Sequence, residues 1–389
     1  MRCPIPKKKL DSLSYNKYIK PLKKILPTVP ELLSRGDRPL KMTFEDQLNA
    51  LIFFHLQEHK SARDLILNLN KNEFAKQNIT PEGGISRSSF SEILNGRGVE
   101  QLLDVFEKLY FEAEQTIPKE YPKLGELISI DGSLIDAVLS MHWADYRKGS
   151  KKAKCHLGFN INAGIPSKIF LTDGNGSERQ FVSQILSKGQ TGVMDRGYQT
   201  HKGFDLWQKE GKSFVCRIKV KTKKTVIDEY DVDPNSYVFY DALVYLGTPG
   251  INRTETPVRV VGYKVDGVKY YVATDRHDLT AEQIATIYKL RWTIETFFKW
   301  WKEHLKVYHL IARSEYGLMA QILGGLISYL LMVIYCRENF NEKVSIKRVR
   351  ELRINILNEL TMSPCQSCNP TGDDNFFKEQ KEKMLNAKT

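Results

Sequence analysis

The chain has 389 residues, of which 41% are hydrophobic and 27% charged, with a formal net charge of +12 at pH 7. This composition excludes a disordered or low-complexity chain, and the length favours two or three domains over one ordinary core. A positive charge attracts polyanions, although an ordinary basic protein fits the bulk charge equally well. Its distribution is more informative: residues 1–41 hold eleven Lys or Arg against three acids, and further cationic clusters occupy 147–154 and 209–224. Clusters throughout the chain favour a long polyanion over a small acidic substrate.

Residues 1–118 are predicted to form a helical N-terminal region that binds DNA. A helix begins at Ser61, and a short helix over 86–94 follows a Gly-Gly turn. Arg87, Ser88 and Ser89 lie on this short helix and Arg97 follows it, a composition that suits a helix lying on DNA. We therefore assign Arg87 and Arg97 as candidate DNA contacts. The surface of an ordinary helical bundle is an equally good interpretation.

Residues 119–218 are predicted as alternating strands and helices. Strands are expected over 127–131, 156–163, 167–172, 191–194 and 213–218, and helices over 177–186 and 201–208. Three antiparallel strands followed by helix, strand, helix and strand is the order of the ribonuclease-H-like fold. In that fold the first and fourth strands lie side by side and parallel. Since Asp131 ends the first strand and Asp195 follows the fourth, we expect these carboxylates to lie together.

Residues 219–276 interrupt this order and are predicted to form a β-rich insertion. Asp266-Gly267 lies between two strand-like runs, a strong signal for a two-residue hairpin. The core is expected to resume over 277–340, where Thr280 and Gln283 form a capping-box pattern at the start of a long helix. The predicted fold class is therefore α/β: a ribonuclease-H-like core with a β-rich insertion, plus an α-helical N-terminal DNA-binding domain.

The predicted helix over 281–305 carries a polar stripe. Four residues follow one another at spacings of 3, 4 and 7: Tyr288, Arg291, Glu295 and Lys302. At about 100° per residue, all four fall within an arc of roughly 60°. Apolar residues occupy the adjoining arc, so the stripe borders the core rather than open water. A simple salt bridge between Arg291 and Glu295 is the alternative for part of this pattern, but the two aspartates on neighbouring strands favour a functional stripe.

Three converging carboxylates are what metal-dependent phosphoryl transfer requires. We predict that Asp131, Asp195 and Glu295 are catalytic and bind two Mg²⁺ ions, with Asp131 shared and with Mn²⁺ as a substitute metal. Carboxylates suit these ions, whereas His or Cys would select other metals. Three other acids fall past strand ends or in a turn and are weaker candidates: Asp136, Asp145 and Asp173.

The other residues of the stripe are predicted DNA contacts. Arg291 and Lys302 would hold phosphates near the scissile bond, because guanidinium and ammonium groups bind phosphate by charge-assisted hydrogen bonds. Tyr288 would supply a hydroxyl to the same backbone.

Residues 318–336 are apolar and long enough to span a bilayer. They contain Gln321, Ser328 and two glycines, so a buried helix packed by its glycines is favoured over a membrane span. The basic start of the chain lacks the apolar core of a secretory signal. We therefore expect a cytoplasmic, nucleoid-associated protein of a prokaryote, with no membrane partner.

Residues 341–389 are predicted as a partly flexible C-terminal region. It contains Cys365 and Cys368, a single C-x-x-C pair. Zinc would need two more ligands at a suitable spacing, and the sequence has no second pair. Two free thiols are therefore the favoured interpretation.

Three motifs together resemble the insertion-sequence-four family of DDE transposases. The stripe Tyr288-x₂-Arg291-x₃-Glu295-x₆-Lys302 matches the family signature at every spacing. Asp131-Gly132-Ser133 resembles the first-aspartate region of the family, and Asp195-Arg196-Gly197-Tyr198 resembles its second-aspartate motif. The resemblance covers about residues 120–335. It implies that Arg196 and Tyr198 also contact DNA.

The resemblance implies a cut-and-paste enzyme that excises an element at its terminal inverted repeats and joins it to target DNA. It implies Mg²⁺, no covalent protein–DNA intermediate, a hairpin on the element end, and a homodimer in the synaptic complex. One feature departs from the family pattern. In relatives a flipped base stacks on a tryptophan of the insertion, whereas the insertion of this chain holds no tryptophan. Other aromatic faces can stack a base, although strand packing is the alternative for each. The candidates are Tyr237, Phe239, Tyr240, Tyr270 and Tyr271.

Three other functions stay open. A catalytically silent DNA-binding protein of transposase descent is one, although all three acids and the signature cations are present. A ribonuclease-H-like nuclease that hydrolyses but never joins strands would share the metal chemistry. A membrane protein built on residues 318–336 is the third, and the polar residues in that stretch disfavour it.

Overall fold

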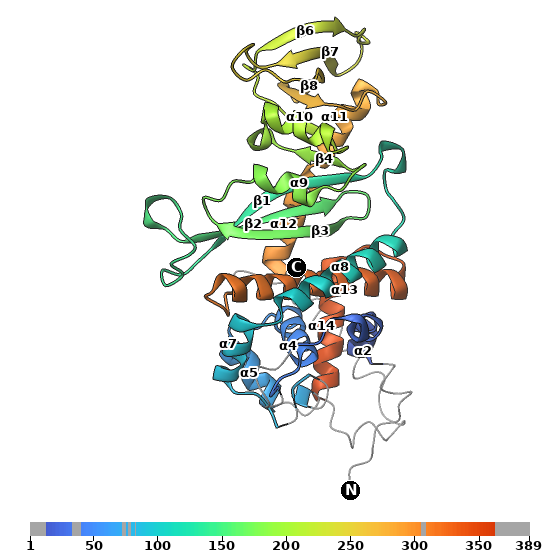
Figure 1. Ribbon diagram of the computed structural model, residues 1–389. Coiled ribbons are helices and arrows are strands. Elements are labelled where there is room, and N and C mark those ends of the chain that lie inside the picture. Colours follow the sequence, from blue (N-terminus) through green and yellow to red (C-terminus); the bar gives the residue numbers. More distant parts are fainter. Residues whose placement is uncertain are drawn as a thin grey trace.

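The computed structural model describes residues 13–32, 40–71, 75–76, 79–81, 83–304 and 309–361. Figure 1 shows an elongated molecule in which helices gather at one end and a sheet runs through the remainder. Helices occur before, between and after the strands along the chain. The predicted α/β class is therefore confirmed.

Helices from both ends of the chain share one hydrophobic core. They are α2 (Ser14–Tyr18), α3 (Leu22–Ile25), α4 (Phe44–Leu56), α5 (Ala62–Lys71), α7 (Arg87–Gly96), α8 (Val99–Thr116), α13 (Glu315–Phe340) and α14 (Ile346–Thr361), with a 3₁₀ turn at Leu26–Thr28. Helix α13 contacts α4, α7 and α8, and α14 contacts α2. Within the described residues, the predicted regions 1–118 and 341–389 therefore belong to the same helical layer (Figure 1). Cys365 and Cys368 lie outside the described residues.

The apolar stretch over 318–336 lies in α13, which passes through the centre of this layer. By length and composition α13 could cross a membrane, but 89% of its most apolar window is buried inside the protein. Its glycines permit close packing: a Cβ on Gly324 would lie 2.8 Å from Leu51 Cβ, and one on Gly325 would lie 3.3 Å from His55 Cε1. The prediction of a buried, glycine-packed helix is confirmed.

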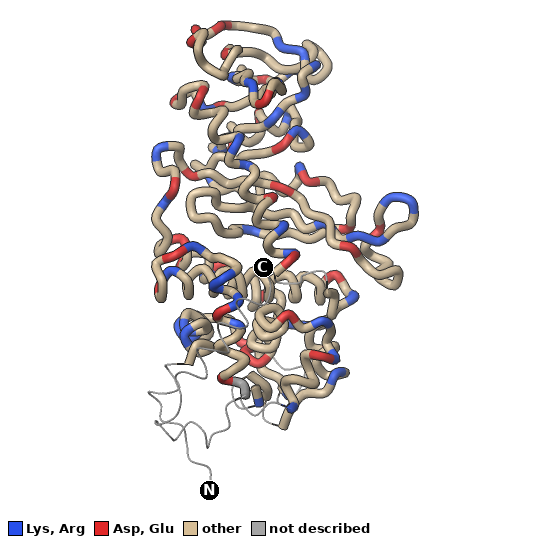
Figure 2. Tube along the Cα trace, turned by 180° about the vertical axis from the view of Figure 1, so that it is seen from behind, with Lys and Arg blue, Asp and Glu red and all other residues tan. Residues whose placement is uncertain are grey.

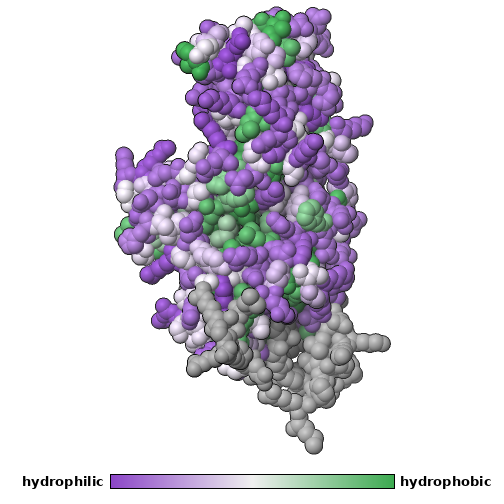
Figure 3. Space-filling model, in the orientation of Figure 1, coloured by the Kyte–Doolittle hydropathy of each residue, from purple (hydrophilic) through white to green (hydrophobic). Residues whose placement is uncertain are grey.

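The face shown in Figure 3 is hydrophilic over most of its area, with apolar surface near its centre.

The described strands form one nine-stranded sheet in the order β3-β2-β1-β4-β5-β9-β8-β7-β6. They are β1 (Leu127–Asp136), β2 (Lys152–Asn160), β3 (Ile165–Asp173), β4 (Thr191–Met194), β5 (Ser213–Arg217), β6 (Lys224–Glu229), β7 (Val238–Leu246), β8 (Val258–Val265) and β9 (Val268–Thr274). Strands β1–β3 pair antiparallel, whereas β1, β4 and β5 pair parallel. The predicted antiparallel pairing of the first three strands and the parallel pairing of the first with the fourth are therefore confirmed.

The insertion extends this sheet rather than forming a separate one. Strand β9 pairs antiparallel with β5, so the core sheet continues into β8, β7 and β6. The predicted hairpin joins β8 to β9, and Asp266 and Gly267 both have positive φ, +48° and +77°. This geometry matches a two-residue turn whose twist follows that of the strands. Figure 1 shows the insertion at the end of the molecule away from the helical layer.

Helices cover both faces of the core strands. Helices α8, α12 (Trp292–His304) and α13 pack against β1–β3. The opposite face packs against α9 (Val182–Ile185) and α10 (His201–Lys209). Helix α11 (Ala281–Leu290) lies on β4, β5, β7 and β8. Its predicted capping box is present, since Thr280 accepts from the amide of Gln283 and Gln283 accepts from that of Thr280.

Two predicted helices differ from the observed ones. The segment 177–186 holds a 3₁₀ turn (Arg179–Phe181) followed by the short α9, which ends where Leu186 takes extended backbone and packs inward. The segment 281–305 is divided into α11 and α12 at Arg291, whose amide donates to the carbonyl of Tyr288 three residues back (3.1 Å). The Arg291 carbonyl accepts a hydrogen bond from Ser129 Oγ on β1 (3.4 Å), which ties this break to the sheet.

Candidate active site

Asp131 and Asp195 occupy neighbouring positions on two parallel strands. The register pairs Ile130 of β1 with Met194 of β4, so the next residue of each chain is an aspartate. Adjacent strands lie about 4.8 Å apart. Strand β4 ends at Met194 while β1 continues, and both carboxylates therefore lie where the sheet opens beside β1. Asp195 caps the turn that follows it, since its Oδ1 accepts from the amide of Gly197 (2.6 Å).

The environment of Asp131 disfavours its charge. Burial is the largest cause, and it raises the pKa of Asp131 to about 6. A hydrogen bond from the Gly132 amide (2.8 Å) and the nearby Arg291 oppose this rise. The carboxylates of Asp195 and Glu178 add to it. Asp131 therefore lies where burial disfavours a carboxylate charge, and a bound cation would stabilise that charge.

Glu295 is paired with Arg291 on the face of the sheet that carries Asp131. Their Oε1 and Nη1 atoms are 2.7 Å apart, and the Glu295 side chain is one-third exposed. Arg291 is buried and also interacts with Asp131. Among the described residues, no group of three or more His, Cys, Asp or Glu side chains is arranged to hold a metal ion. The structure thus brings the two aspartates together, whereas Glu295 reaches them only through Arg291.

The two other stripe residues are directed inward. Tyr288 is buried and its hydroxyl has no hydrogen-bond partner; burial raises its pKa. Lys302 donates from Nζ to the carbonyl oxygen of Leu134 on β1 (2.7 Å), and burial lowers its pKa. Neither side chain is presented to an external phosphate in this structure, which differs from the sequence expectation because both pack against the sheet.

Of the residues expected on DNA from the second-aspartate motif, one faces outward. Arg196 is exposed beside Asp195. Tyr198 is fully buried, and its hydroxyl has no hydrogen-bond partner. Burial raises the pKa of Tyr198, as do the nearby charges of Glu178, Asp131 and Asp195. Tyr198 therefore offers no exposed surface to DNA in this structure, because its side chain is buried.

The two candidate DNA contacts in the helical layer differ from each other in exposure. Arg87 is exposed at the first turn of α7, whose N-cap Ser86 accepts from the amide of Ser89 (3.1 Å). Arg97 is half-buried and donates from Nη2 to the carbonyl of Met42 (3.2 Å). In this structure it joins the end of α7 to the segment before α4.

Sequence reasoning missed Glu178. Its carboxylate lies against Gly132, where a Cβ would meet Glu178 Oε1 at 2.8 Å. Glu178 follows the end of β3, and a signal was available, because acids that follow strand ends gather at the same edge as Asp195. Because residues 177–186 are predicted as a helix, Glu178 is interpreted as part of that helix and not as an acid after a strand end.

Cationic and aromatic side chains occur on the β1–β2 connection and on strands β5, β6 and β9. The β1–β2 connection projects from the sheet, and Figure 2 shows it lined with Lys and Arg; it includes Arg147, Lys148 and Lys151. Arg217 at the end of β5 lies 4.7 Å from the ring centre of Tyr270 on the insertion, and Lys224 lies 4.7 Å from that of Tyr271. Such pairs present flat rings together with positive charge.

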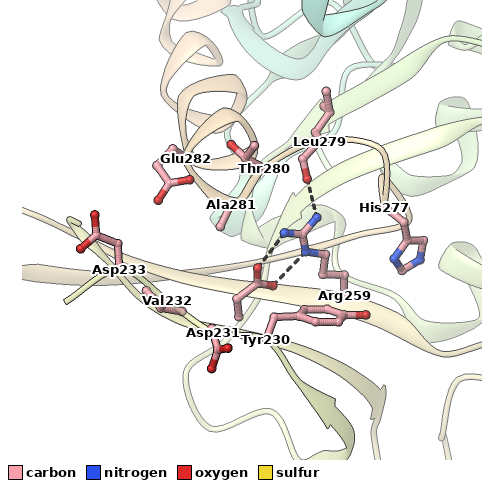
Figure 4. Close-up of a pocket in the computed structure, with 11 residues that line it drawn as sticks. Tyr230, Asp231, Val232, Asp233, Arg259, His277, Leu279, Thr280, Ala281 and Glu282 are labelled. Carbon is pink, nitrogen blue, oxygen red and sulfur yellow. Dashed lines mark hydrogen bonds and ion pairs between the residues drawn. The ribbon is translucent and has the colours of Figure 1, made fainter. Parts of the chain in front are cut away.

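One pocket lies on the insertion rather than at the aspartates (Figure 4). It is lined by Tyr230, Asp231, Val232, Asp233, Asp241, Arg259, His277, Leu279, Thr280, Ala281 and Glu282. Arg259 is held there by Asp241 (2.6 Å) and donates to the Leu279 carbonyl (2.6 Å). These contacts fasten the segment before α11 to the insertion. An acidic lining repels phosphate, so this pocket is not the DNA site.

Residues 122–331, which contain both aspartates and Glu295, match the family model described as "Transposase DDE domain". The match covers more than half of the chain, which therefore belongs to the DDE transposases. Within them it belongs to the insertion-sequence-four family. It is 29% identical over 261 residues to the putative transposase for insertion sequence element IS4SA of Synechocystis sp., covering 63% of this chain and 70% of that protein.

Two further relatives are similar over shorter stretches. The putative transposase y4zB of Sinorhizobium fredii is 29% identical over 207 residues, covering 51% of this chain and 57% of that protein. The probable transposase for insertion sequence element IS5377 of Geobacillus stearothermophilus is 26% identical over 193 residues, covering 49% and 51%. This chain thus spans little more than half the length of these two relatives. A piggyBac transposase synaptic complex with hairpin DNA matches with a TM-score of 0.42 and 11% identity, over 96% of this chain and 82% of that one; this likeness is too weak to support an argument.

Proposed function

We propose that this protein cuts an insertion element at its terminal inverted repeats and joins it to target DNA, using a ribonuclease-H-like core. The observation that carries the proposal is the adjacency of Asp131 and Asp195 on parallel strands β1 and β4. Helix α12 places Glu295 on the same face of the sheet. Membership of the DDE transposases supplies the class of reaction.

The carboxylates suit Mg²⁺, with Mn²⁺ as a substitute. Asp131 and Asp195 offer hard oxygen atoms on adjacent strands. Burial is the main cause of the raised pKa of Asp131, and a bound cation would stabilise the charged form that burial disfavours. Glu295 would join them after leaving Arg291. When bound, two ions activate the attacking oxygen and stabilise the leaving oxygen.

The protein side chains orient the DNA around these carboxylates. Arg291 would lose its partner when Glu295 turns to the aspartates, and its guanidinium would then be available to a phosphate near the cleaved bond. Arg196 is exposed beside Asp195 and is placed to bind the adjoining backbone. Arg87 offers a further contact on the helical layer. Double-stranded DNA, both element end and target, is thus the proposed partner, in the nucleoid of a prokaryotic cytoplasm.

We further propose a homodimer in the synaptic complex and a hairpin on the element end. A hairpin requires a base to leave the stack, and an aromatic face stabilises the displaced base. Tyr270 and Tyr271 on the insertion carry an adjacent cation, and Trp292 at the start of α12 is 63% exposed beside Arg291. These are the candidates for that face.

The products formed from labelled element-end DNA test this proposal. With Mg²⁺, the proposal predicts nicked ends, a hairpin that migrates at twice the strand length on a denaturing gel, and insertions into a target plasmid. Hydrolysed ends without insertions would instead identify a nuclease that never joins strands. Binding without any cleavage would identify a catalytically silent DNA-binding protein.

A further inference from the structure

A fourth carboxylate borders the two aspartates. Glu178 approaches from the side of the sheet opposite to α12, where Gly132 has no side chain to exclude it. A Cβ placed on Gly197 would lie 2.9 Å from Asp195 Oδ1 and 3.8 Å from Glu178 Oε2. The carboxylates of Asp195 and Glu178 therefore border the same small space above Gly197.

The segment that carries Glu178 is fixed in place. Arg179 donates from Nε to the carbonyl of Gly197 (2.9 Å), which ties this segment to the turn after Asp195. Lys154 Nζ lies 3.3 Å from Glu178 Oε1 and also donates to the carbonyl of Gly176 (3.1 Å). The position of Glu178 is thus set by the contacts of Arg179 on one side and of Lys154 on the other.

A buried hydroxyl points independently to a ligand at this place. Tyr198 has no exposed surface, and its Oη has no hydrogen-bond partner. The charges that act on this hydroxyl are those of Glu178, Asp131 and Asp195. A buried polar group without a partner is costly. A small movement of these carboxylates on binding an ion would give Tyr198 an acceptor.

The local charges also balance a divalent cation. Lys154 pairs with Glu178, and Arg291 pairs with Glu295. After these two pairings, Asp131 and Asp195 keep two negative charges in a partly buried place. One divalent cation would neutralise them, whereas the ammonium of Lys154 opposes its approach.

We propose that Glu178 binds the divalent cation together with Asp131 and Asp195, and that the Tyr198 hydroxyl positions the Glu178 carboxylate. This inference rests on the proposed function, because it adds a ligand to the same metal site. Lys154 neutralises Glu178 while no cation is bound and competes with it. Tyr198 is a positioning residue, since it acts through the carboxylate.

Binding of Mn²⁺ to the full chain without DNA tests the proposal, with free Mn²⁺ measured by electron paramagnetic resonance. Glu178→Gln and Asp195→Asn should each weaken binding about tenfold or more. Lys154→Gln should strengthen it several-fold, because a repelling charge is removed. Asp136→Asn is the matched control: this exposed carboxylate on β1 pairs with Lys152, and its loss should leave binding unchanged.

The outcomes separate this inference from the function on which it rests. If Asp195→Asn loses affinity for Mn²⁺ and Glu178→Gln binds it as the wild type does, Glu178 is not a ligand and the proposed metal site stands. If the wild type binds Mn²⁺ no better than Asp195→Asn does, both the Glu178 ligand and the proposed metal site are wrong. Glu178→Asp, which keeps the charge but shortens the side chain, should also weaken binding and serves if Glu178→Gln does not fold.

The role of Tyr198 is tested by coupling. Tyr198→Phe keeps the ring and should weaken Mn²⁺ binding several-fold with an unchanged circular dichroism spectrum. The double variant with Glu178→Gln should bind no more weakly than Glu178→Gln alone, because the hydroxyl acts through that carboxylate. Additive losses would show that the tyrosine acts independently and would overturn the positioning role.

Discussion

The Nζ atom of Lys302 lies 2.7 Å from the carbonyl oxygen of Leu134, so the last residue of the family signature is bound to strand β1. Lys302→Met removes the donor and leaves a half-buried carbonyl without its partner. We expect the free energy of unfolding to fall by about 1–2 kcal/mol in urea titrations. The salt dependence of DNA binding should stay the same, whereas a slope reduced by about one would show that Lys302 contacts a phosphate.

The pair of Arg291 and Glu295 provides a second prediction. Arg291 is buried, and its removal leaves Glu295 without a cation beside two aspartates. Because Glu295 is one-third exposed, water compensates part of the loss, and Arg291→Met should lower the free energy of unfolding by about 1–3 kcal/mol. Lys299→Met is the control: it removes an exposed cation from the same helix and should change stability by less than about 0.5 kcal/mol. Equal effects would contradict the buried pairing.

The raised pKa of Asp131 predicts a pH dependence. Its pKa of about 6 in the folded protein exceeds the ordinary value of 3.8, so the folded state holds this proton more tightly than the unfolded state. The contribution of Asp131 to stability is therefore most favourable below about pH 4 and declines as the pH rises to 6. Without divalent ions, the free energy of unfolding of the wild type should fall between pH 4 and pH 7, relative to that of Asp131→Asn, by at most about 3 kcal/mol. A pH-independent difference between the two proteins in urea unfolding would show that the carboxyl is not perturbed.

The close contact at Gly324 gives a prediction about the core. A Cβ there would lie 2.8 Å from Leu51 Cβ, so Gly324→Ala forces α13 and α4 apart. Overpacking should cost about 1–3 kcal/mol and exceed the gain of roughly 1 kcal/mol from the better helix propensity of alanine. Thermal unfolding measures the difference. Gly96→Ala has no atom within 4 Å of the added Cβ, and it should be neutral or stabilising; a stable Gly324→Ala would mean that the helices tolerate separation.

Local patterns predicted those parts of the fold that local chemistry determines. The strand over Thr191–Met194, the hairpin at Asp266-Gly267 and the cap at Thr280 all appear where expected. Strand order followed from the sequence of elements, and it placed Asp131 beside Asp195. These features depend on short runs of apolar residues and on turn residues.

Features that depend on packing between distant segments were not predictable. The inward positions of Lys302 and Tyr198 follow from the hydrogen bond of Lys302 to β1 and from the packing of Tyr198 in the apolar core, which no spacing reveals. The carbonyl at the break, that of Arg291, bonds to the hydroxyl of Ser129, which is far away in the chain. The position of Glu178 after a strand end was a signal in the sequence, but the room that Gly132 leaves for its carboxylate was not.

Cleavage of element-end DNA by the wild type and by Asp195→Asn, with Mg²⁺ present and DNA binding measured in parallel, tests the central claim most directly. If Asp131 and Asp195 act together in strand cleavage, Asp195→Asn should reduce the cleavage rate at least about 100-fold while binding DNA about as tightly as the wild type. Asp136→Asn, on the same sheet, should cut normally. Cleavage by Asp195→Asn at the wild-type rate would contradict the assignment of these two aspartates.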